Sequence, residues 1–203
     1  MRVDERSIRE SLKRSLVEES ALSHKLLLIE EMSIKNGYSR IDLVTIGDSL
    51  CGFEIKSDRD SIRRLAHQVE QYSTILDYAE LVVGEKLIKK ATEYIPDWWG
   101  LRLAVPNKNR IQIEVIRKSQ INPNPDPYSI SQLLWRRESL TLLSEYIPTS
   151  GYSRLGKKAI HEALAKVVPF PLLRMRVIDS LKRRRGWPVD SQRQLYGGLF
   201  QPV

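Results

Sequence analysis

Hydrophobic residues in the first third of the chain follow two different periods. Ile8, Leu12 and Leu16 recur every fourth residue, which is the spacing of one face of an α-helix and predicts a helix over residues 4–20. Short runs rich in apolar residues follow, separated by turn dipeptides, at residues 24–34, 39–46 and 50–57. Runs of this length with turns between them predict an antiparallel meander of three strands.

The helical period returns after the third run, and further strands follow it. Residues 60–78 place apolar side chains at alternating steps of three and four, with Asp60 as the expected N-cap. The pattern then predicts a buried strand, a short helix and two strands of a hairpin, at residues 79–84, 85–94, 101–105 and 110–118. The expected order is helix, three strands, helix, strand, short helix and hairpin.

Residues 121–129 (INPNPDPYS) carry three prolines within five positions, which neither a helix nor the interior of a sheet accommodates. We place a linker there, between a domain at residues 1–120 and a second region at residues 130–203. The second region has helical patterns at residues 131–146, 154–168 and 171–185, with no strand pattern between them. The sequence therefore predicts an α/β domain followed by a helical region.

Charge is distributed unevenly between these two parts. Residues 1–129 hold 20 Lys and Arg against 20 Asp and Glu, and residues 130–203 hold 13 against 5. The whole net charge of +8 therefore lies in the last third. A basic region attached to a neutral domain is typical of contact with a polyanion, and basic helices that are merely solvated are the alternative.

The remaining composition excludes several classes of protein. With 41% hydrophobic and 29% charged residues, the chain has the composition of a folded protein rather than a disordered one. A single cysteine, Cys51, and three histidines exclude a disulfide framework and the spacing of a zinc finger. The charged N-terminus contains no apolar signal segment, and no apolar run approaches membrane-spanning length. We therefore expect a cytoplasmic protein without membrane contact.

Two consecutive predicted strands carry charged residues within apolar runs. Alternation places Glu54 and Lys56 on one face of their strand and Phe53 and Ile55 on the other. Asp42 interrupts the preceding strand, and a hairpin would bring its carboxylate close to Glu54. Two neighbouring carboxylates repel each other, and a divalent cation with oxygen ligands relieves that repulsion. With a lysine beside them they form the minimal set for metal-dependent hydrolysis of nucleic acid, whereas a salt bridge on a half-solvated sheet is the simpler alternative.

These residues resemble the PD-(D/E)XK phosphodiesterase superfamily, which has the restriction-endonuclease-like fold. The resemblance covers residues 1–118 and rests on Asp42 and the triplet Glu54-Ile55-Lys56 on consecutive strands. The stretches RIDLV and GFEIKSDRDSIRRLAHQVEQY are also similar to bacterial proteins known only as nuclease-like. One departure is Ile41, which stands where the superfamily's name has proline.

The resemblance implies a mixed sheet flanked by helices and the hydrolysis of phosphodiester bonds, with DNA as the favoured substrate. It further implies that Mg²⁺ or Mn²⁺ is held by Asp42, Glu54 and the carbonyl oxygen of Ile55, and that Lys56 orients the attacking water.

Members of the superfamily often carry a further acidic residue upstream, for which Glu30 and Glu31 are the candidates. Alternation along the strand would place one toward the core face and the other outward. We favour Glu31, because its spacing to the following glycine and Arg-x-Asp matches similar sequences, and we expect it to complete the metal site through a water molecule. Two solvated glutamates near a strand end are the alternative.

Candidate substrate contacts lie on the helix after the triplet and near the end of the chain. Gln68 and Tyr72 share one helical face and resemble the Gln-x-x-x-Tyr motif that RecB-type nucleases place beside the metal to hold the substrate backbone. Tyr72 fits an ordinary core position equally well. Arginines gather at the start of this helix and after the last apolar stripe, as Arg59, Arg63, Arg64, Arg183, Arg184 and Arg185. They are either phosphate contacts or solvated faces, and we expect the last three to continue their helix into solvent.

Other functions remain open on the sequence alone. The chain could bind nucleic acid on a nuclease fold without cleaving it, or it could be a protein-interaction module, as a homodimer or with an acidic partner. An enzyme for small phosphorylated substrates is a third alternative, but the sequence has no Gly-rich phosphate loop.

Overall fold

The computed structural model describes residues 4–20, 26–108, 110–184, 192–196 and 199–202. The first part of the chain forms α1 (Glu5–Ser20), β1 (Leu26–Ile34), the 3-10 turn η1 (Lys35–Gly37), β2 (Ser39–Ile46), β3 (Leu50–Lys56), α2 (Leu65–Ser73), β4 (Tyr78–Gly84), α3 (Ile88–Thr92), β5 (Gly100–Asn107) and β6 (Arg110–Arg117). The second part forms α4 (Pro127–Ser131), α5 (Arg136–Ser144), η2 (Tyr152–Arg154), α6 (Lys157–Val167), α7 (Phe170–Arg183), β7 (Gln192–Tyr196) and β8 (Leu199–Pro202).

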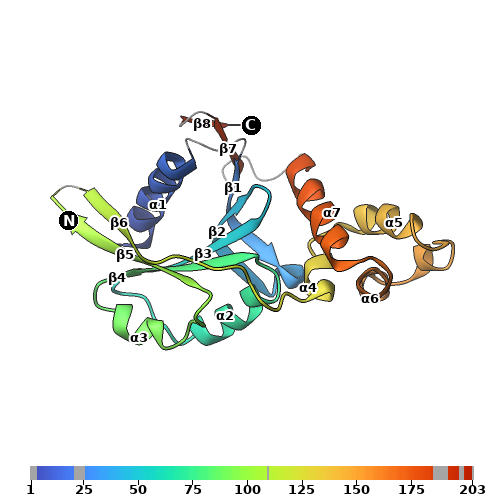
Figure 1. Cartoon of the computed structure of the whole chain (residues 1–203), viewed down its shortest axis with the longest axis horizontal. Helices are drawn as coiled ribbons and strands as arrows, with labels where there is room; N and C mark the ends of the chain where they lie inside the picture. The colour runs from blue at the N-terminus through green and yellow to red at the C-terminus, as the bar shows by residue number, and fades with distance from the viewer. Residues whose placement is uncertain (1–3, 21–25, 109, 185–191, 197–198, 203) are drawn as a thin grey trace.

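The strands of the described residues form one mixed sheet in the order β6-β5-β4-β3-β2-β1-β7-β8. β1, β2 and β3 are antiparallel neighbours, which confirms the predicted meander. β4 and β5 run parallel to β3, because helical connections through α2 and α3 carry the chain back across the sheet. β6 returns beside β5 as the predicted hairpin. The fold is therefore a mixed α/β sheet flanked by helices (Figure 1).

Helices cover both faces of this sheet and leave a core on each side. The predicted stripe of α1, formed by Ile8, Leu12 and Leu16, packs on one face in a cluster that includes Phe53. On the other face α2 contributes Tyr72 to a larger core, which also takes in apolar side chains of the helices α4 to α7. No helix in the described part of the chain is long and apolar enough to cross a bilayer.

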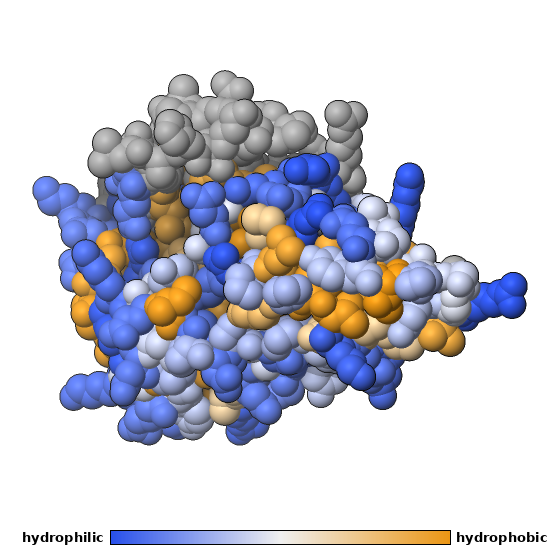
Figure 2. Space-filling model, turned by 45° about the vertical axis from the view of Figure 1, so that its right-hand side comes forward, coloured by the Kyte–Doolittle hydropathy of each residue, from blue (hydrophilic) through white to orange (hydrophobic). Residues whose placement is uncertain are grey.

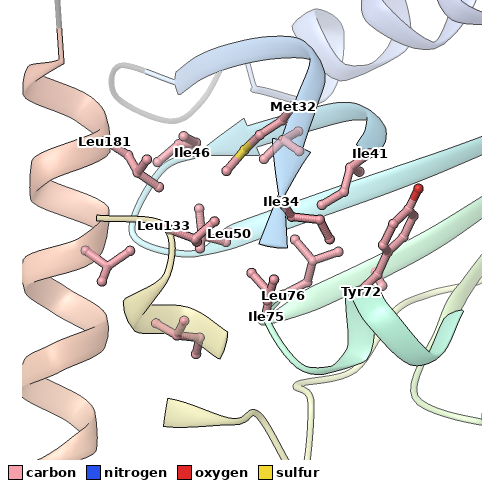
Figure 3. Packing of buried hydrophobic residues seen from close by; sticks show 14 of the residues in the cluster. Met32, Ile34, Ile41, Ile46, Leu50, Tyr72, Ile75, Leu76, Leu133 and Leu181 are labelled. Atoms are coloured by element: carbon pink, nitrogen blue, oxygen red, sulfur yellow. The ribbon is translucent and has the colours of Figure 1, made fainter. Parts of the chain in front are cut away.

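The C-terminal helices pack against the same core as the sheet. Figure 3 shows Leu133 and Leu181 of this region beside Leu50 and Ile46 of the β2–β3 hairpin. The proline-rich segment 121–129 is also docked, since the Asn122 side-chain amide donates to the carbonyls of Ser73 and Leu76, at 2.7 Å each. The prolines interrupt regular structure without separating two cores, so the predicted linker lies against the sheet.

The surface of the helical region mixes polar and apolar side chains. Figure 2 turns this side of the molecule toward the viewer and shows apolar side chains between hydrophilic ones. Exposed large apolar residues of the region include Trp135, Leu155 and Met175. The net positive charge of this part of the sequence therefore does not correspond to a uniformly basic surface.

Three predictions of element boundaries are wrong. α2 begins at Leu65 rather than at Asp60, because the Asp60 carboxylate accepts the Ser57 amide at 2.6 Å and shapes the exit from β3. The helix predicted over residues 131–146 is instead divided into α4 and α5. The helical region does not continue to the end of the chain, since β7 and β8 follow it and β7 pairs with β1.

Candidate active site

The hairpin of β2 and β3 separates at Asp42. Its described pairing ends at Leu43 and Phe53. Beyond that point the Ile55 amide donates to Oδ2 of Asp42 at 2.8 Å, so a side chain replaces a backbone carbonyl as the acceptor. The Asp42 side chain therefore joins β2 to β3 beyond the end of their backbone pairing.

Glu54, Lys56 and Tyr72 meet on the α2 side of this separation. Glu54 is 1% exposed, and the Lys56 ammonium donates to its Oε1. The Tyr72 hydroxyl lies 2.8 Å from Glu54 Oε2 and also contacts the carbonyl oxygen of Arg40. Tyr72 rises from α2 beside Ile41, as Figure 3 shows. The predicted pair Glu54 and Lys56 therefore shares one face, with Tyr72 both in the core and in contact with the carboxylate.

Gln68 joins the same group from the preceding turn of α2. Its Nε2 lies 3.5 Å from the Tyr72 hydroxyl, as the four-residue spacing predicted. Its Oε1 is buried and has no hydrogen-bond partner among the described residues. Buried polar atoms are normally paired, so this amide is available for a further ligand or water.

Glu31 interrupts the alternation of side chains along β1. Its φ of 55° is in the left-handed region, and the side chains before and after it exchange faces. Leu27 and Ile29 before it point to the same core as Met32 and Ile34 after it, although regular alternation would put the two pairs on opposite faces. The expectation that the two glutamates lie on opposite faces, one toward the core and one outward, is therefore wrong, because Glu30 and Glu31 both meet basic residues of α1.

Glu31, Asp42 and Glu5 form an acidic cluster at the N-terminal end of α1. Each offers a carboxylate oxygen, and these atoms lie within 4.8 Å of one another. Glu30 lies outside the cluster and binds Lys13 at 2.8 Å. The structure thus brings Glu31 rather than Glu30 to Asp42.

Sequence reasoning missed Glu5 and its neighbour Arg9. Arg9 Nη2 lies 2.5 Å from a carboxylate oxygen of Glu5 and of Glu31, and 4.0 Å from Asp42. One signal was present, since Glu5 precedes Ile8 of the apolar stripe by three residues and so lies beside the face that packs on the sheet.

Burial raises the pKa of the two central carboxyl groups. Burial, followed by the nearby charge of Glu54, raises the pKa of Asp42 to about 7, against the opposing effect of the Ile55 hydrogen bond. Burial also raises the pKa of Glu54, although Lys56 opposes the change. A proton on Glu54 would let Tyr72 donate to the Arg40 carbonyl while still contacting Glu54. Raised carboxyl pKa values at a cleft are typical of functional sites.

A cleft of about 540 Å³ opens over the acidic cluster. Its lining includes Glu5, Glu31, Tyr38, Asp42, Arg64, His67 and Gln68. Of the arginines predicted at the start of α2, Arg64 therefore borders the site, whereas Arg59 and Arg63 are exposed but do not line the cleft.

The arginines predicted at the end of α7 are not equivalent. Arg183 is exposed and pairs loosely with Asp179 at 3.9 Å. Arg184 is buried against the helical region, where its guanidinium binds Glu138 at 2.7 Å and lies 4.2 Å from the centre of the Trp135 ring. The expectation that Arg184 faces solvent is wrong, because the helix ends at Arg183 and the Arg184 guanidinium pairs with Glu138. Arg185 lies outside the described residues.

Comparison with known sequences places the chain in a family. Residues 2–191 match the family described as bacteriophage P4 protein cII. The chain belongs to this family. It is 27% identical over 157 residues to protein cII of Enterobacteria phage P4. That similarity covers 77% of this chain and 59% of the phage P4 protein.

A solved structure of the SPO1766 protein of unknown function from Silicibacter pomeroyi is also similar to this chain. The two share 14% sequence identity and superpose with a TM-score of 0.45 over 90% of this chain and 93% of that protein.

Proposed function

We propose that this member of the family is a metal-dependent nuclease of the PD-(D/E)XK type that hydrolyses phosphodiester bonds of DNA. The observation that carries the proposal is the meeting of Asp42 with Glu54 and Lys56 where β2 and β3 separate. Carboxylates from two adjacent strands and a buried lysine are brought to one place. A purely structural salt bridge between Glu54 and Lys56 would not need Asp42 nearby, because the negative charge of Asp42 repels that of Glu54.

The order of elements supports the same proposal. The chain runs α1, β1, β2, β3, α2 and β4, which is the order expected from the resemblance. Asp42 lies on β2 and the Glu54-Ile55-Lys56 triplet on β3, so the candidate residues come from the two strands that the resemblance assigns to them.

The donor set fits a divalent cation such as Mg²⁺ or Mn²⁺. Asp42, Glu54 and the carbonyl oxygen of Ile55 would hold it, and Glu31 with Glu5 would supply carboxylates to it or to its water. These are the hard oxygen ligands that such cations prefer. Burial and then the nearby charge of Glu54 raise the pKa of Asp42, and a cation would relieve the second of these effects. When bound, the cation would stabilise negative charge developing on the phosphodiester oxygens.

The protein's own residues have separate roles in this proposal. The Lys56 ammonium orients the attacking water and withdraws electron density from it. The Tyr72 hydroxyl holds Glu54 in place. The side-chain amide of Gln68 donates from Nε2 to a phosphate oxygen of the substrate backbone. Arg64 adds positive charge at the border of the cleft.

The direct test is incubation of the purified chain with circular single-stranded and circular duplex DNA, with Mg²⁺, with Mn²⁺ and with EDTA. Cleavage that requires the cation is expected, and Asp42→Ala, Glu54→Ala and Lys56→Ala should each abolish it because the three act as one unit. Asp97→Ala is the matched control, since Asp97 is fully exposed and lies outside the cleft lining. Full activity in any of the three site variants would refute the site assignment.

One observation favours a second candidate, a nucleic-acid-binding protein that does not cleave. Arg9 already neutralises part of the acidic cluster, and Arg40 binds Glu31 at 3.0 Å, so some of these carboxylates have partners without a cation. DNA binding that needs no divalent cation, with no cleavage under any condition, would support this candidate.

A further inference from the structure

Tyr38 is the most exposed large aromatic side chain at the candidate site. It follows the turn η1 between β1 and β2 and lines the cleft, yet 73% of its surface is accessible. The turn can hold Tyr38 in this exposed position because Gly37, just before it, has a φ of 89°, a conformation that glycine adopts without strain. The Tyr38 amide then bonds to the carbonyl of Lys35 at 3.3 Å.

His67 of α2 holds the Tyr38 ring from the other wall of the cleft. The two rings meet edge to face, with centroids 5.6 Å apart and planes at 82°. This contact orients the Tyr38 ring and joins the β1–β2 turn to α2, while most of the tyrosine surface stays accessible. An oriented aromatic ring with accessible surface is a platform on which another planar group can stack.

Positive charge lies beside this platform. Arg64 precedes α2, lines the same cleft and makes no side-chain hydrogen bond or ion pair among the described residues. Arg40 is also exposed and reaches Glu31 at 3.0 Å. The cleft therefore combines an exposed aromatic ring and cationic groups at its border with carboxylates at its floor.

We propose that the cleft takes single-stranded DNA, with one base stacked on Tyr38 and the adjoining phosphate beside Arg64. This inference rests on the nuclease function proposed above and names the form of its substrate. Exposed aromatic rings with nearby cations bind single strands without regard to sequence, because every base has a stacking face. In a duplex both faces of a base are covered by its neighbours, and exposing one costs unstacking energy.

Binding and cleavage are measured separately on the full chain. Fluorescence anisotropy compares a labelled single-stranded oligonucleotide with the blunt duplex of the same sequence, in Ca²⁺, with a gel to verify that the DNA stays intact. A second oligonucleotide carries 2-aminopurine, whose fluorescence falls when it stacks on an aromatic ring. The variants are Tyr38→Ala, Tyr38→Phe and Tyr38→Trp, and Tyr94→Ala is the control for another exposed tyrosine outside the cleft lining.

Tyr38→Ala should weaken single-strand binding about 5- to 100-fold, the loss expected for one stacked base. It should also abolish the 2-aminopurine quenching, while duplex binding and the melting temperature stay near wild type. Tyr38→Phe and Tyr38→Trp should retain binding, because stacking needs the ring and not the hydroxyl. Tyr94→Ala should bind as wild type.

Equal binding of single strand and duplex, or single-strand binding indifferent to Tyr38→Ala, would overturn the inference. A loss in Tyr38→Phe as large as in Tyr38→Ala would also overturn it, since the hydroxyl would then carry the effect. Cleavage that persists unchanged in Tyr38→Ala refutes the inference and leaves the nuclease standing. Tyr38-dependent single-strand binding without cleavage in Mg²⁺ or Mn²⁺ supports the inference and refutes the nuclease.

Discussion

The Ile55 amide of β3 is bound by the carboxylate of Asp42 on β2, at 2.8 Å. A backbone donor of the sheet thus depends on a side chain whose own pKa is raised to about 7 by burial and by Glu54. The carboxylate completes the hydrogen bonding of the sheet, but its negative charge is costly where it lies. The hydrogen bond that Asp42 accepts from Ile55 therefore stabilises the fold, whereas the negative charge of the ionised carboxylate destabilises it.

Asp42→Asn should stabilise the cation-free protein at pH 8 and have much less effect at pH 5. The folded-state pKa of about 7 lies above the unfolded value of about 3.9. The folded state therefore binds more protons between these values, and wild-type stability falls as the pH rises through this window. Asparagine keeps an acceptor for the Ile55 amide without the charge, so the gain at pH 8 should be roughly 1–4 kcal/mol.

Urea unfolding at the two pH values in EDTA measures this difference. Asp42→Ala is the comparison variant, because it removes the acceptor as well as the charge and should lose about 1–3 kcal/mol relative to Asp42→Asn. If Asp42→Asn is no more stable than wild type at pH 8, the Asp42 carboxylate is not destabilised by its surroundings.

Arg9→Gln should tighten the binding of Mn²⁺ by about tenfold, or ~1.4 kcal/mol. Arg9 lies among the carboxylates of Glu5, Glu31 and Asp42 and competes with a cation for them. Two unit charges 4 Å apart at a dielectric of 20 interact by roughly 4 kcal/mol. We expect the smaller gain of ~1.4 kcal/mol in Mn²⁺ binding because the Arg9 guanidinium can move into water when the cation binds.

Isothermal titration with Mn²⁺ measures the affinity without any substrate. Arg14→Gln is the matched control on the same helix, because Arg14 bonds to Ser11 and lines a different cleft. Arg9→Gln should also be less stable than wild type when the cation is absent, because the carboxylates of Glu5, Glu31 and Asp42 then lose a counter-charge. Weaker Mn²⁺ binding in Arg9→Gln would show that Arg9 organises the cluster for the cation instead of competing with it.

Gln68→Ala should weaken DNA binding or turnover by about tenfold without lowering Mn²⁺ affinity or the melting temperature. Its buried Oε1 has no partner among the described residues, and its Nε2 lies as far as 3.5 Å from the Tyr72 hydroxyl, so removing the amide costs the folded protein little. Tyr72→Phe should behave differently and lose roughly 1–3 kcal/mol of stability, because the hydroxyl serves both Glu54 and the Arg40 carbonyl. Thermal unfolding and DNA titration on both variants separate the two roles, and a destabilised Gln68→Ala with normal activity would place Gln68 in the core.

Local patterns predicted most of the sheet and the centre of the candidate site. β2 has the predicted bounds, and Glu54 and Lys56 share a face because strand alternation is a local property. Asp42 reaches them because a short turn fixes which strands are neighbours. These inferences needed only period, turn residues and chain order.

Features that depend on distant contacts were not predictable in the same way. Alternation gave the wrong face for Glu31, because the positive φ at this residue reverses it and Glu31 meets α1 on the same side as Glu30. Glu5 reaches the site only when α1 packs across the sheet. The strand β7 is short and polar, and its pairing with β1 joins residues from opposite ends of the chain.

Arg183 and Arg184 are adjacent in sequence and should give opposite results when each is changed to glutamine. Arg184 binds Glu138 and the carbonyl of Leu133, at 2.7 Å each, and packs over Trp135. Losing it should destabilise the protein by roughly 2–4 kcal/mol, because Glu138 and the carbonyl are left without their partner. Arg183 is 83% exposed in its side chain, so Arg183→Gln should leave the melting temperature unchanged.

The two variants, Arg183→Gln and Arg184→Gln, should also differ in DNA binding measured over a range of salt concentrations. Each phosphate contact contributes about 0.9 to the slope of log K against log salt on duplex DNA. If the end of α7 meets the phosphate backbone, Arg183→Gln should lower that slope by about this amount, whereas Arg184→Gln should leave it unchanged. An unchanged slope in Arg183→Gln would exclude this end of α7 from the DNA path, leaving the arginines at the start of α2 as the predicted contacts. A lower slope in Arg184→Gln would mean that its guanidinium leaves Glu138 and Trp135 when DNA binds.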